Sequence, residues 1–388
     1  MRILQIAPPW IATPPSGYGG TELVIHNLCR GLFELGHDVT LFATKNSSSP
    51  GELDFVFNRG LVEMDIDWSA SLPPLVHYHQ AFHEADQYDI VHAHLSSGTD
   101  LVILPFLSDL AHKGKAAVMT IHGHWPYDRN SYMDPYFKRL YAKDIAAISI
   151  SRAMQKLLPK EFRDIGYIHN SLDLNTLSFR ARPGRYTNTS SSASRARGNN
   201  EGYLAWLGKI LPDKGTHEAI LAAKEAGERL VLGGIVEKYD KRSVEYFETK
   251  VKPLIDDDQI VYIGPLDLKA KNKLLGGAKA FLNPIAWEEP FGMVMIESMA
   301  CGTPVISYNR GAAPEIIRHG KNGFLVKSRK EMVKAIAIID TIKRKDCRKY
   351  VEEKFSPVAA ARKHIEIYQK EITKADIGQR KNLARVVG

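Results

Sequence analysis

The sequence predicts an α/β protein built from two doubly wound parallel sheets. Short β-branched runs alternate with amphipathic helical patterns in both halves of the chain, and this alternation is typical of parallel sheets covered by helices. A polar stretch that begins near residue 180 interrupts the alternation, which restarts at Tyr203. The length of 388 residues is sufficient for two domains of ordinary size.

The first half, residues 1–178, is expected to form one of these domains. Between the first two expected strands, Glu22–Leu35 has the periodicity of an amphipathic helix, and Gly36 is expected to end it. The expected strands are Ile3–Ala7, Asp38–Ala43, Asp89–Ala93, Ala117–Ile121 and Ala146–Ile150.

Residues 179–202 are expected to be a flexible linker or surface loop, because they are polar, small and basic. Residues 203–359 then repeat the βα pattern, with a helix at His217–Glu225, and the terminal run Pro357–Lys374 is also expected to be helical. The expected strands are Tyr203–Leu207, Arg229–Leu232, Gln259–Ile263, Ala280–Asn283 and Val305–Tyr308. Two such domains are expected to face a cleft at the carboxyl ends of their strands, where ligands of open α/β sheets bind.

The composition is that of a globular protein, with 44% hydrophobic and 25% charged residues. No apolar run approaches the roughly 20 residues that cross a bilayer, and the run Met1–Ala7 is too short for a signal peptide. The 3 cysteines are far apart, which suggests neither a disulfide framework nor a zinc site. The expected location is therefore the reducing cytoplasm.

The net charge of +8 is unevenly distributed, with −5 in residues 1–179 and +13 in residues 180–388. An anionic ligand is therefore expected in the second half. A nucleic-acid partner is not expected, because the basic residues form no stripe with interleaved aromatics and no nucleic-acid motif is present.

The most informative stretch is residues 288–306. A loop with two adjacent acids passes through Pro-Phe-Gly into an apolar helical run, and Glu297 follows eight positions after Glu289. If a helix begins near Phe291 or Gly292, its first backbone N–H groups form an anion site, and Gly292 lacks the Cβ that would keep a phosphate away. Glu289 then stays in the loop and Glu297 falls on the helix body, so the two acids are not side by side and can reach opposite ends of a bound anionic ligand. The alternative is that Glu289 complements the helix dipole and Glu297 is a solvated helix residue.

This layout resembles the donor-site signature of family 4 of the glycosyltransferases, which are retaining nucleotide-sugar enzymes with the GT-B fold. The resemblance extends over nearly the whole chain, is strongest in residues 203–326 and is absent from the linker. It implies two Rossmann-like domains, an acceptor-side domain at 1–178 and a donor-binding domain at 203–359. It also implies that a C-terminal helix at 360–388 packs back on the first domain.

The same resemblance implies roles for individual residues. Glu289 would position the sugar hydroxyls and Glu297 the ribose, while Lys209, Lys214 and the helix start would stabilise charge on the leaving diphosphate. The implied catalytic residues are His122, Lys214 and Glu289. The implied donor-binding residues are Gly19, Gly20, Lys209, Lys214, Gly234, Phe291, Gly292, Met293, Val294 and Glu297.

Several of these residues depend more heavily on the resemblance than on local pattern. Gly19 and Gly20 open the first helix, where a structural turn is the alternative to a loop that touches phosphate or acceptor. His122 follows an apolar strand and matches the family position that contacts the transferred sugar. His92 and His94 alternate on one face of another strand and are expected to line the cleft rather than to hold a metal.

Lys209 and Gly234 match the family pattern less directly. Lys209 stands where the family usually has an arginine, so the charge is kept but the two-pronged geometry is lost. Gly234 follows an expected strand and is interpreted as part of a close-approach turn near the nucleotide.

No metal and no cofactor other than the nucleotide sugar is expected. The pairs Asp65/Asp67 and Asp256/Asp258 imitate a metal-binding Asp-x-Asp motif, but their surroundings predict solvated turns. Basic residues and helix N-termini can replace a metal at a pyrophosphate.

The expected function is retaining transfer of a sugar from a nucleotide-diphosphate sugar, with a UDP-sugar preferred, to a hydroxyl acceptor. A glycan or small soluble acceptor is favoured, and peripheral membrane contact is left open. Two alternatives remain: a nucleotide-sugar epimerase of the same fold, and a non-catalytic nucleotide-sugar binding protein.

Overall fold

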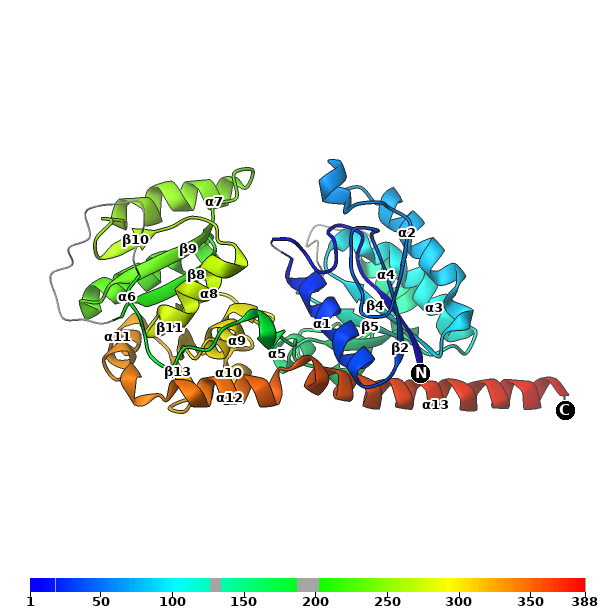
Figure 1. Ribbon diagram of the computed structural model, residues 1–388. Coiled ribbons are helices and arrows are strands. Elements are labelled where there is room, and N and C mark those ends of the chain that lie inside the picture. Colours follow the sequence, from blue (N-terminus) through cyan, green and yellow to red (C-terminus); the bar gives the residue numbers. More distant parts are fainter. Residues whose placement is uncertain (18, 126–133, 187–201, 388) are drawn as a thin grey trace. The chain divides into compact units, whose positions relative to one another are not determined.

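The computed structural model describes residues 1–17, 19–125, 134–186 and 202–387, with side chains described as far as residue 379. Contacts within the chain define two compact units (Figure 1). The first unit comprises Met1–Ser171 and Ser356–Gly388, and the second comprises Leu172–Phe355. These breaks lie a few residues before the boundaries drawn from the sequence at 178 and 359.

The first unit contains a seven-stranded sheet in which all described pairings are parallel, in the order β3-β2-β1-β4-β5-β6-β7. The strands are β1 Arg2–Ile6, β2 Asp38–Ala43, β3 Glu52–Phe55, β4 Ile90–Leu95, β5 Ala117–Ile121, β6 Ala146–Ser149 and β7 Arg163–Tyr167. The helices are α1 Gly20–Glu34, α2 Leu72–His83, α3 Leu104–His112, α4 Asp134–Tyr141, α5 Arg152–Gln155 and α13 Pro357–Val387.

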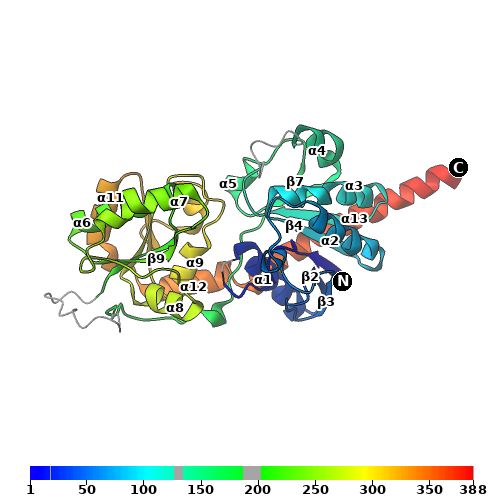
Figure 2. The same cartoon turned by 90° about the horizontal axis from the view of Figure 1, so that it is seen from above.

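Successive residues of each central strand enter two different cores, because strand side chains alternate between the faces of a sheet. Ile3 packs in a core with Ile25 and Leu28 of α1, whereas Leu4 packs in a core with Leu107 of α3. Each face is therefore covered by helices, as Figures 1 and 2 show, and the sheet is buried on both sides.

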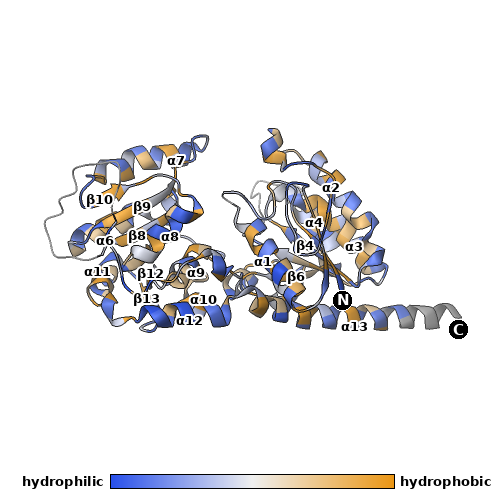
Figure 3. Cartoon of the chain, in the orientation of Figure 1, coloured by the Kyte–Doolittle hydropathy of each residue, from blue (hydrophilic) through white to orange (hydrophobic). Residues whose placement is uncertain are grey.

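The long C-terminal helix α13 belongs to the first unit and packs against α1 and the sheet. A Cβ on Gly31 would lie 2.3 Å from the carbonyl oxygen of Pro357, so the two helices approach closely at a glycine. Farther along α13, the guanidinium of Arg163 donates two hydrogen bonds, of 2.8 and 2.6 Å, to the Glu371 carboxylate. Apolar and polar residues alternate along this helix in Figure 3, as expected for a helix with one buried face.

The second unit contains a six-stranded parallel sheet in the order β10-β9-β8-β11-β12-β13. The strands are β8 Leu204–Lys209, β9 Leu230–Ile235, β10 Ile260–Tyr262, β11 Ala280–Asn283, β12 Val305–Tyr308 and β13 Gly323–Val326. The helices are α6 Thr216–Ala226, α7 Lys241–Tyr246, α8 Leu268–Gly277, α9 Met293–Ala300, α10 Ala313–Ile316, α11 Arg329–Ala337 and α12 Arg344–Lys354.

The prediction of two doubly wound parallel sheets is confirmed. Every strand expected from the sequence is present within three residues of its expected ends, and three strands, β3, β7 and β13, were not expected. The interpretation of Gly234 as a turn residue is wrong, since Gly234 lies inside β9. Within the part of the chain that the structure describes, no helix is both long enough and apolar enough to span a membrane.

The predicted linker at 179–202 is described only in part. Its first residues pack on the second unit, where the N–H of Arg180 donates to the carbonyl of Cys301 at 3.0 Å and that of Gly184 to Gly277 at 2.9 Å. Residues 187–201, which include most of the predicted flexible segment, lie outside the described residues.

Candidate functional site

The order of strands in the second unit brings two predicted site residues into contact. Because β8 and β11 are neighbours in a parallel sheet, the loops that follow them meet at one edge. Lys214 ends a short 3-10 turn after β8, and its Nζ lies 2.5 Å from Oε2 of Glu289 in the loop after β11. The indole N–H of Trp287 donates to the same oxygen at 2.8 Å, and the Lys214 ammonium lies 4.9 Å from the Trp287 ring centroid.

Backbone contacts hold these two loops in register. The N–H of Ala286 donates to the carbonyl of Asp213 at 2.8 Å. A Cβ on Gly215, which has a φ of 69°, would lie 2.0 Å from the Pro284 carbonyl oxygen, so only glycine allows this approach. The position of Lys214 beside the acid is therefore set by main-chain packing as well as by charge.

The helix α9 begins where the sequence predicts, with Gly292 as its N-cap in the left-handed region at a φ of 83°. The first N–H groups of the helix, including those of Met293 and Val294, have no intrahelical acceptor by position. The ring of Phe291 is buried and packs against Phe355 with ring centroids 5.9 Å apart, so only the backbone of Phe291 is available to a ligand. A helix terminus of this kind, with free N–H groups and an apolar anchor beneath it, is suited to an anion.

Glu297 occupies the second turn of α9, as predicted, but it is not the solvated helix residue of the alternative reading. It is 6% exposed, and its Oε1 lies 2.6 Å from Nζ of Lys271 on α8. Glu289 likewise remains outside the helix and is 9% exposed. Each of the two predicted acids is therefore buried and paired with a lysine.

The other two predicted residues of the second unit have different surroundings. Lys209 is the last residue of β8, and its Nζ lies 2.9 Å from Oε1 of Glu237. A Cβ on Gly234 would lie 1.9 Å from the carbonyl oxygen of Gly208 on the neighbouring strand. Close packing of the two strands therefore explains why residue 234 is a glycine, and no ligand is needed to explain it.

In the first unit, Gly19 is the N-cap of α1 and Gly20 is its first residue. A Cβ on Gly19 would lie 2.9 Å from a carboxylate oxygen of Glu22, whereas a Cβ on Gly20 would meet no atom within 4 Å. Burial raises the pKa of Glu22 to about 7, and the nearby negative charge of Asp100 also raises it. The turn therefore carries a buried acid that the motif analysis did not identify.

His122 directly follows β5, and its Nε2 lies 2.9 Å from Nδ1 of His94. Burial lowers the pKa of His122 to about 3, with a smaller contribution from His364. The prediction that His92 and His94 line a cleft is wrong. They are 0% and 1% exposed and belong to an interior network beneath α13.

The pairs Asp65/Asp67 and Asp256/Asp258, which imitate a metal-binding motif, lie in turns, as expected. Asp256 accepts hydrogen bonds from the N–H groups of Asp258 and Ile260 at 3.2 and 2.8 Å, and Asp67 accepts from Ser69. Among the described residues there is no group of three or more His, Cys, Asp or Glu side chains that could hold a metal ion.

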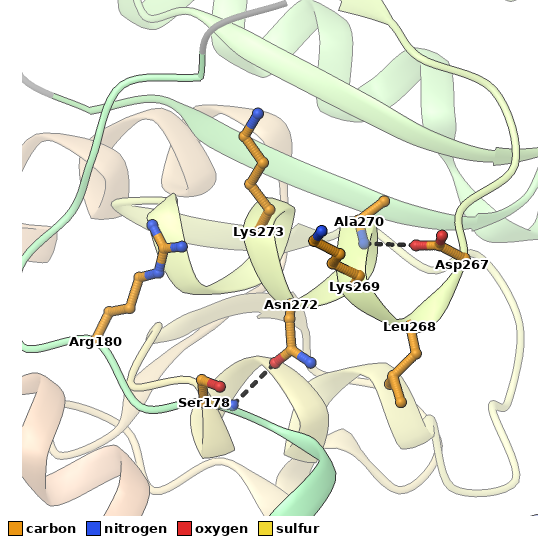
Figure 4. A pocket seen from close by; sticks show the side chains of 8 residues that line it. All are labelled: Ser178, Arg180, Asp267, Leu268, Lys269, Ala270, Asn272 and Lys273. Atoms are coloured by element: carbon orange, nitrogen blue, oxygen red, sulfur yellow. Dashed lines mark hydrogen bonds between the residues drawn. The ribbon is translucent and has the colours of Figure 1, made fainter.

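A separate surface pocket of about 730 Å³ lies at the start of α8 (Figure 4). Basic and polar side chains surround it, and Oδ1 of Asn272 accepts a hydrogen bond from the N–H of Ser178 at 2.9 Å. None of the predicted site residues lines this pocket.

Reasoning from the sequence missed Trp287, Lys271 and Glu22. Trp287 lies two residues before Glu289 and could have been selected with the motif. Lys271 carried no local signal, because its relation to Glu297 arises only when α8 packs beside α9.

Comparison with known proteins agrees with this fold. The family model of the glycosyl transferases group 1 matches residues 188–354, and that of glycosyltransferase family 4 matches residues 18–176. Together these matches cover most of the chain. The chain belongs to the glycosyltransferases of family 4 and has the GT-B fold.

Individual relatives are distant. A Bacillus subtilis protein named as a glycosyltransferase is 26% identical over 187 residues, which are 44% of this chain and 46% of the relative. The chain thus matches less than half the length of this curated relative. Among solved structures, the sucrose-phosphate synthase of Thermosynechococcus elongatus has a TM-score of 0.71 at 18% identity, covering 95% of this chain and 98% of that one. An Anabaena protein in complex with UDP and glucose has a TM-score of 0.66 at 20% identity, with 95% and 100% coverage.

Proposed function

We propose that the protein is a retaining glycosyltransferase that moves a sugar from a nucleotide-diphosphate sugar to a hydroxyl acceptor. The observation that carries the proposal is the contact of Lys214 and Glu289 near the N-terminus of α9, together with the buried Glu297 in the second turn of that helix. This arrangement offers a cation and helix N–H groups for a diphosphate, with one acid on either side of them.

The proposed roles follow from position. Lys214 and the first N–H groups of α9 stabilise negative charge on the leaving diphosphate. Glu289 accepts hydrogen bonds from sugar hydroxyls, and the indole N–H of Trp287 fixes its carboxylate. Glu297 accepts from the ribose hydroxyls, and Lys271 keeps that carboxylate oriented. Lys209, Gly19, Gly20 and His122 remain proposed contacts to the donor.

A UDP-sugar is the proposed donor, in keeping with the Anabaena structure of the same fold that holds UDP and glucose. The proposed acceptor is a hydroxyl of a glycan or small molecule, and the proposed location is the cytoplasm, where the three free, buried cysteines would stay reduced. Activation of the acceptor by the leaving phosphate is the proposed route to retention.

Incubation with a panel of nucleotide sugars in the absence of acceptor tests the proposal. Slow release of the nucleoside diphosphate from one of them is expected of a transferase. Isomerisation of the sugar would instead indicate an epimerase, and binding without either reaction would indicate a non-catalytic binding protein.

The variant Glu297→Gln tests the ribose role. The glutamine amide still accepts from the ribose but carries no charge, and replacing a charged hydrogen bond by a neutral one is expected to weaken UDP binding by roughly 1 kcal/mol, measured by calorimetry. Glu248→Gln is the matched control, because Glu248 lies in the same unit and forms an exposed pair with Lys252 at 2.6 Å. Equal UDP affinity in the two variants would exclude the proposed role of Glu297.

A further inference from the structure

A chain of buried polar side chains connects the C-terminal helix α13 to His122. The Tyr368 hydroxyl accepts a hydrogen bond of 3.0 Å from Nε2 of Gln5, whose Oε1 lies 2.9 Å from Nε2 of His94. Nδ1 of His94 in turn lies 2.9 Å from Nε2 of His122. Gln5, His94 and Tyr368 are at most 1% exposed, so their contacts with one another are shielded from water, and the chain reaches the part-buried ring of His122 from the interior.

The orientation of the Gln5 amide sets the direction of each hydrogen bond, because its Nε2 lies beside the Tyr368 hydroxyl and its Oε1 beside His94. Tyr368 accepts from the Gln5 amide, and its own proton can be donated to Nδ1 of His92, which lies 2.6 Å away. The ring of His92 then donates from Nε2 to the Thr120 hydroxyl at 2.8 Å. These directions satisfy the Gln5 amide with its oxygen toward His94.

This orientation determines which nitrogen of each ring carries the proton. The carbonyl oxygen of the Gln5 amide can only accept, so Nε2 of His94 must carry a hydrogen. Burial keeps the pKa of His94 well below its ordinary value, so its ring is neutral and Nδ1 is an acceptor. Nε2 of His122 must therefore donate to that nitrogen, which leaves Nδ1 of His122 with a lone pair.

We propose that Gln5, His94 and Tyr368 are positioning residues that hold His122 in the Nε2–H tautomer and present its Nδ1 as an acceptor to a hydroxyl of the donor sugar. This inference rests on the proposed function, because it takes the ligand to be a sugar. An acceptor nitrogen selects a group that can donate, so the site favours a hydroxyl at the contacted carbon over a deoxy position or an ether. The C-terminal helix thereby contributes to sugar recognition through the interior of the first unit.

The primary experiment reads the tautomer directly, by long-range proton–nitrogen NMR on the full chain labelled with ¹⁵N-histidine. The His122 resonances are assigned as the pair of ring-nitrogen signals that is present in the unaltered protein and absent from the His122→Gln variant. The expected spectrum has Nε2 of His122 protonated and Nδ1 unprotonated at neutral pH. The opposite assignment, with a hydrogen on Nδ1, would overturn the proposal.

Two variants test the relay, and a third is the control. Tyr368→Phe removes the hydroxyl that orients the amide, and Gln5→Met removes the amide at similar volume, so either is expected to give His122 signals averaged between the two tautomers. Tyr78→Phe removes another buried hydroxyl of the same unit, one that donates to Asp100 at 2.9 Å, and is expected to leave the His122 spectrum unchanged. An unaltered spectrum in Tyr368→Phe and Gln5→Met would also overturn the proposal.

Binding separates this inference from the function on which it rests. Tyr368→Phe is expected to weaken UDP-glucose binding roughly 2- to 10-fold, the effect of one neutral hydrogen bond, with UDP affinity unchanged because UDP lacks the sugar. Equal weakening of both ligands would refute the sugar contact. If no nucleotide sugar binds at all, the proposed function fails, while the NMR result still decides the tautomer.

Discussion

Arg344 of α12 joins several parts of the second unit, and its removal should destabilise that unit. It is 9% exposed, and its guanidinium donates to the carbonyl oxygens of Arg180, Ala278 and Gly276 at 2.8, 2.7 and 2.7 Å. It also donates to the Thr303 hydroxyl at 2.7 Å. These acceptors come from the ends of α8 and α9 and from the segment that enters the unit, so one side chain joins three separate parts of the chain.

The variant Arg344→Met keeps an unbranched apolar side chain and removes every donor. The buried carbonyl groups of Gly276 and Ala278 and the part-buried carbonyl of Arg180 each lose a donor, at about 1–3 kcal/mol each. The cost of burying the guanidinium charge is recovered at the same time. We therefore expect the free energy of unfolding to fall by about 3–4 kcal/mol. Lys349→Met on the same helix is the control, because the Lys349 side chain is 69% exposed and should change stability by less than about 0.5 kcal/mol.

Denaturant titration followed by tryptophan fluorescence measures this difference, since Trp206 is fully buried in the second unit. The expected result is a lower unfolding midpoint for Arg344→Met than for the control. A midpoint equal to that of Lys349→Met would refute the reasoning, because it would mean that the backbone carbonyls find other donors.

Three further outcomes are expected. Lowering the pH from 7 to 5 should destabilise the first unit, because burial lowers the pKa of His122 to about 3 and of His364 to about 4, so the unfolded chain binds more protons below about 6.5. The loss, up to about 1.4 kcal/mol per pH unit for each such histidine, is partly opposed by Glu22, and thermal melts across that range measure it. Glu289→Gln should bind UDP more tightly, by roughly 2- to 5-fold in calorimetry, because Lys214 is released from its acid, and weaker UDP binding would contradict this. Nucleoside-diphosphate release should be the same in chelator as in magnesium or manganese, and a loss that added metal restores would overturn the metal-free mechanism.

Most of the fold could be predicted because its strands are buried on both faces. The strand at Ala280–Asn283 is fully buried and was expected at the observed residues, as was the strand at Val305–Tyr308. The edge strand β3, Glu52–Phe55, carries two acids in four residues and is only partly buried, so no apolar run marks it. Polar edge strands depend on their neighbour for pairing and therefore carry little signal of their own.

The candidate site was predictable in its parts but not in its contacts. Lys214 and Glu289 were each identified from a local motif, 75 residues apart in the chain. Their contact depends on the order of strands, which places β8 directly beside β11. The pairing of Glu297 with Lys271 depends in the same way on the packing of α8 against α9.

The histidines show how a correct local inference can lead to a wrong conclusion. Alternation along β4 does place His92 and His94 on one face of the sheet, as the sequence indicates. That face is covered by α13, whose Tyr368 is 276 residues away from His92 in sequence. A helix so distant in the chain cannot be assigned to a particular sheet face from strand periodicity, so exposure to ligand was inferred where burial is observed.

The net charge of the second half of the chain predicts the kind of ligand but not which lysines are free to bind it. The second half of the chain carries the positive excess, which led us to expect an anionic ligand there. Yet the lysines predicted to meet a diphosphate, Lys209 and Lys214, are each paired with an acid, at 2.9 and 2.5 Å. Net charge acts at long range by attracting an anion to this half of the protein. Short-range binding must then rest on the N–H groups of α9 and on exchange of Lys214 from Glu289 to phosphate, an exchange that leaves the Glu289 carboxylate able to accept sugar hydroxyls.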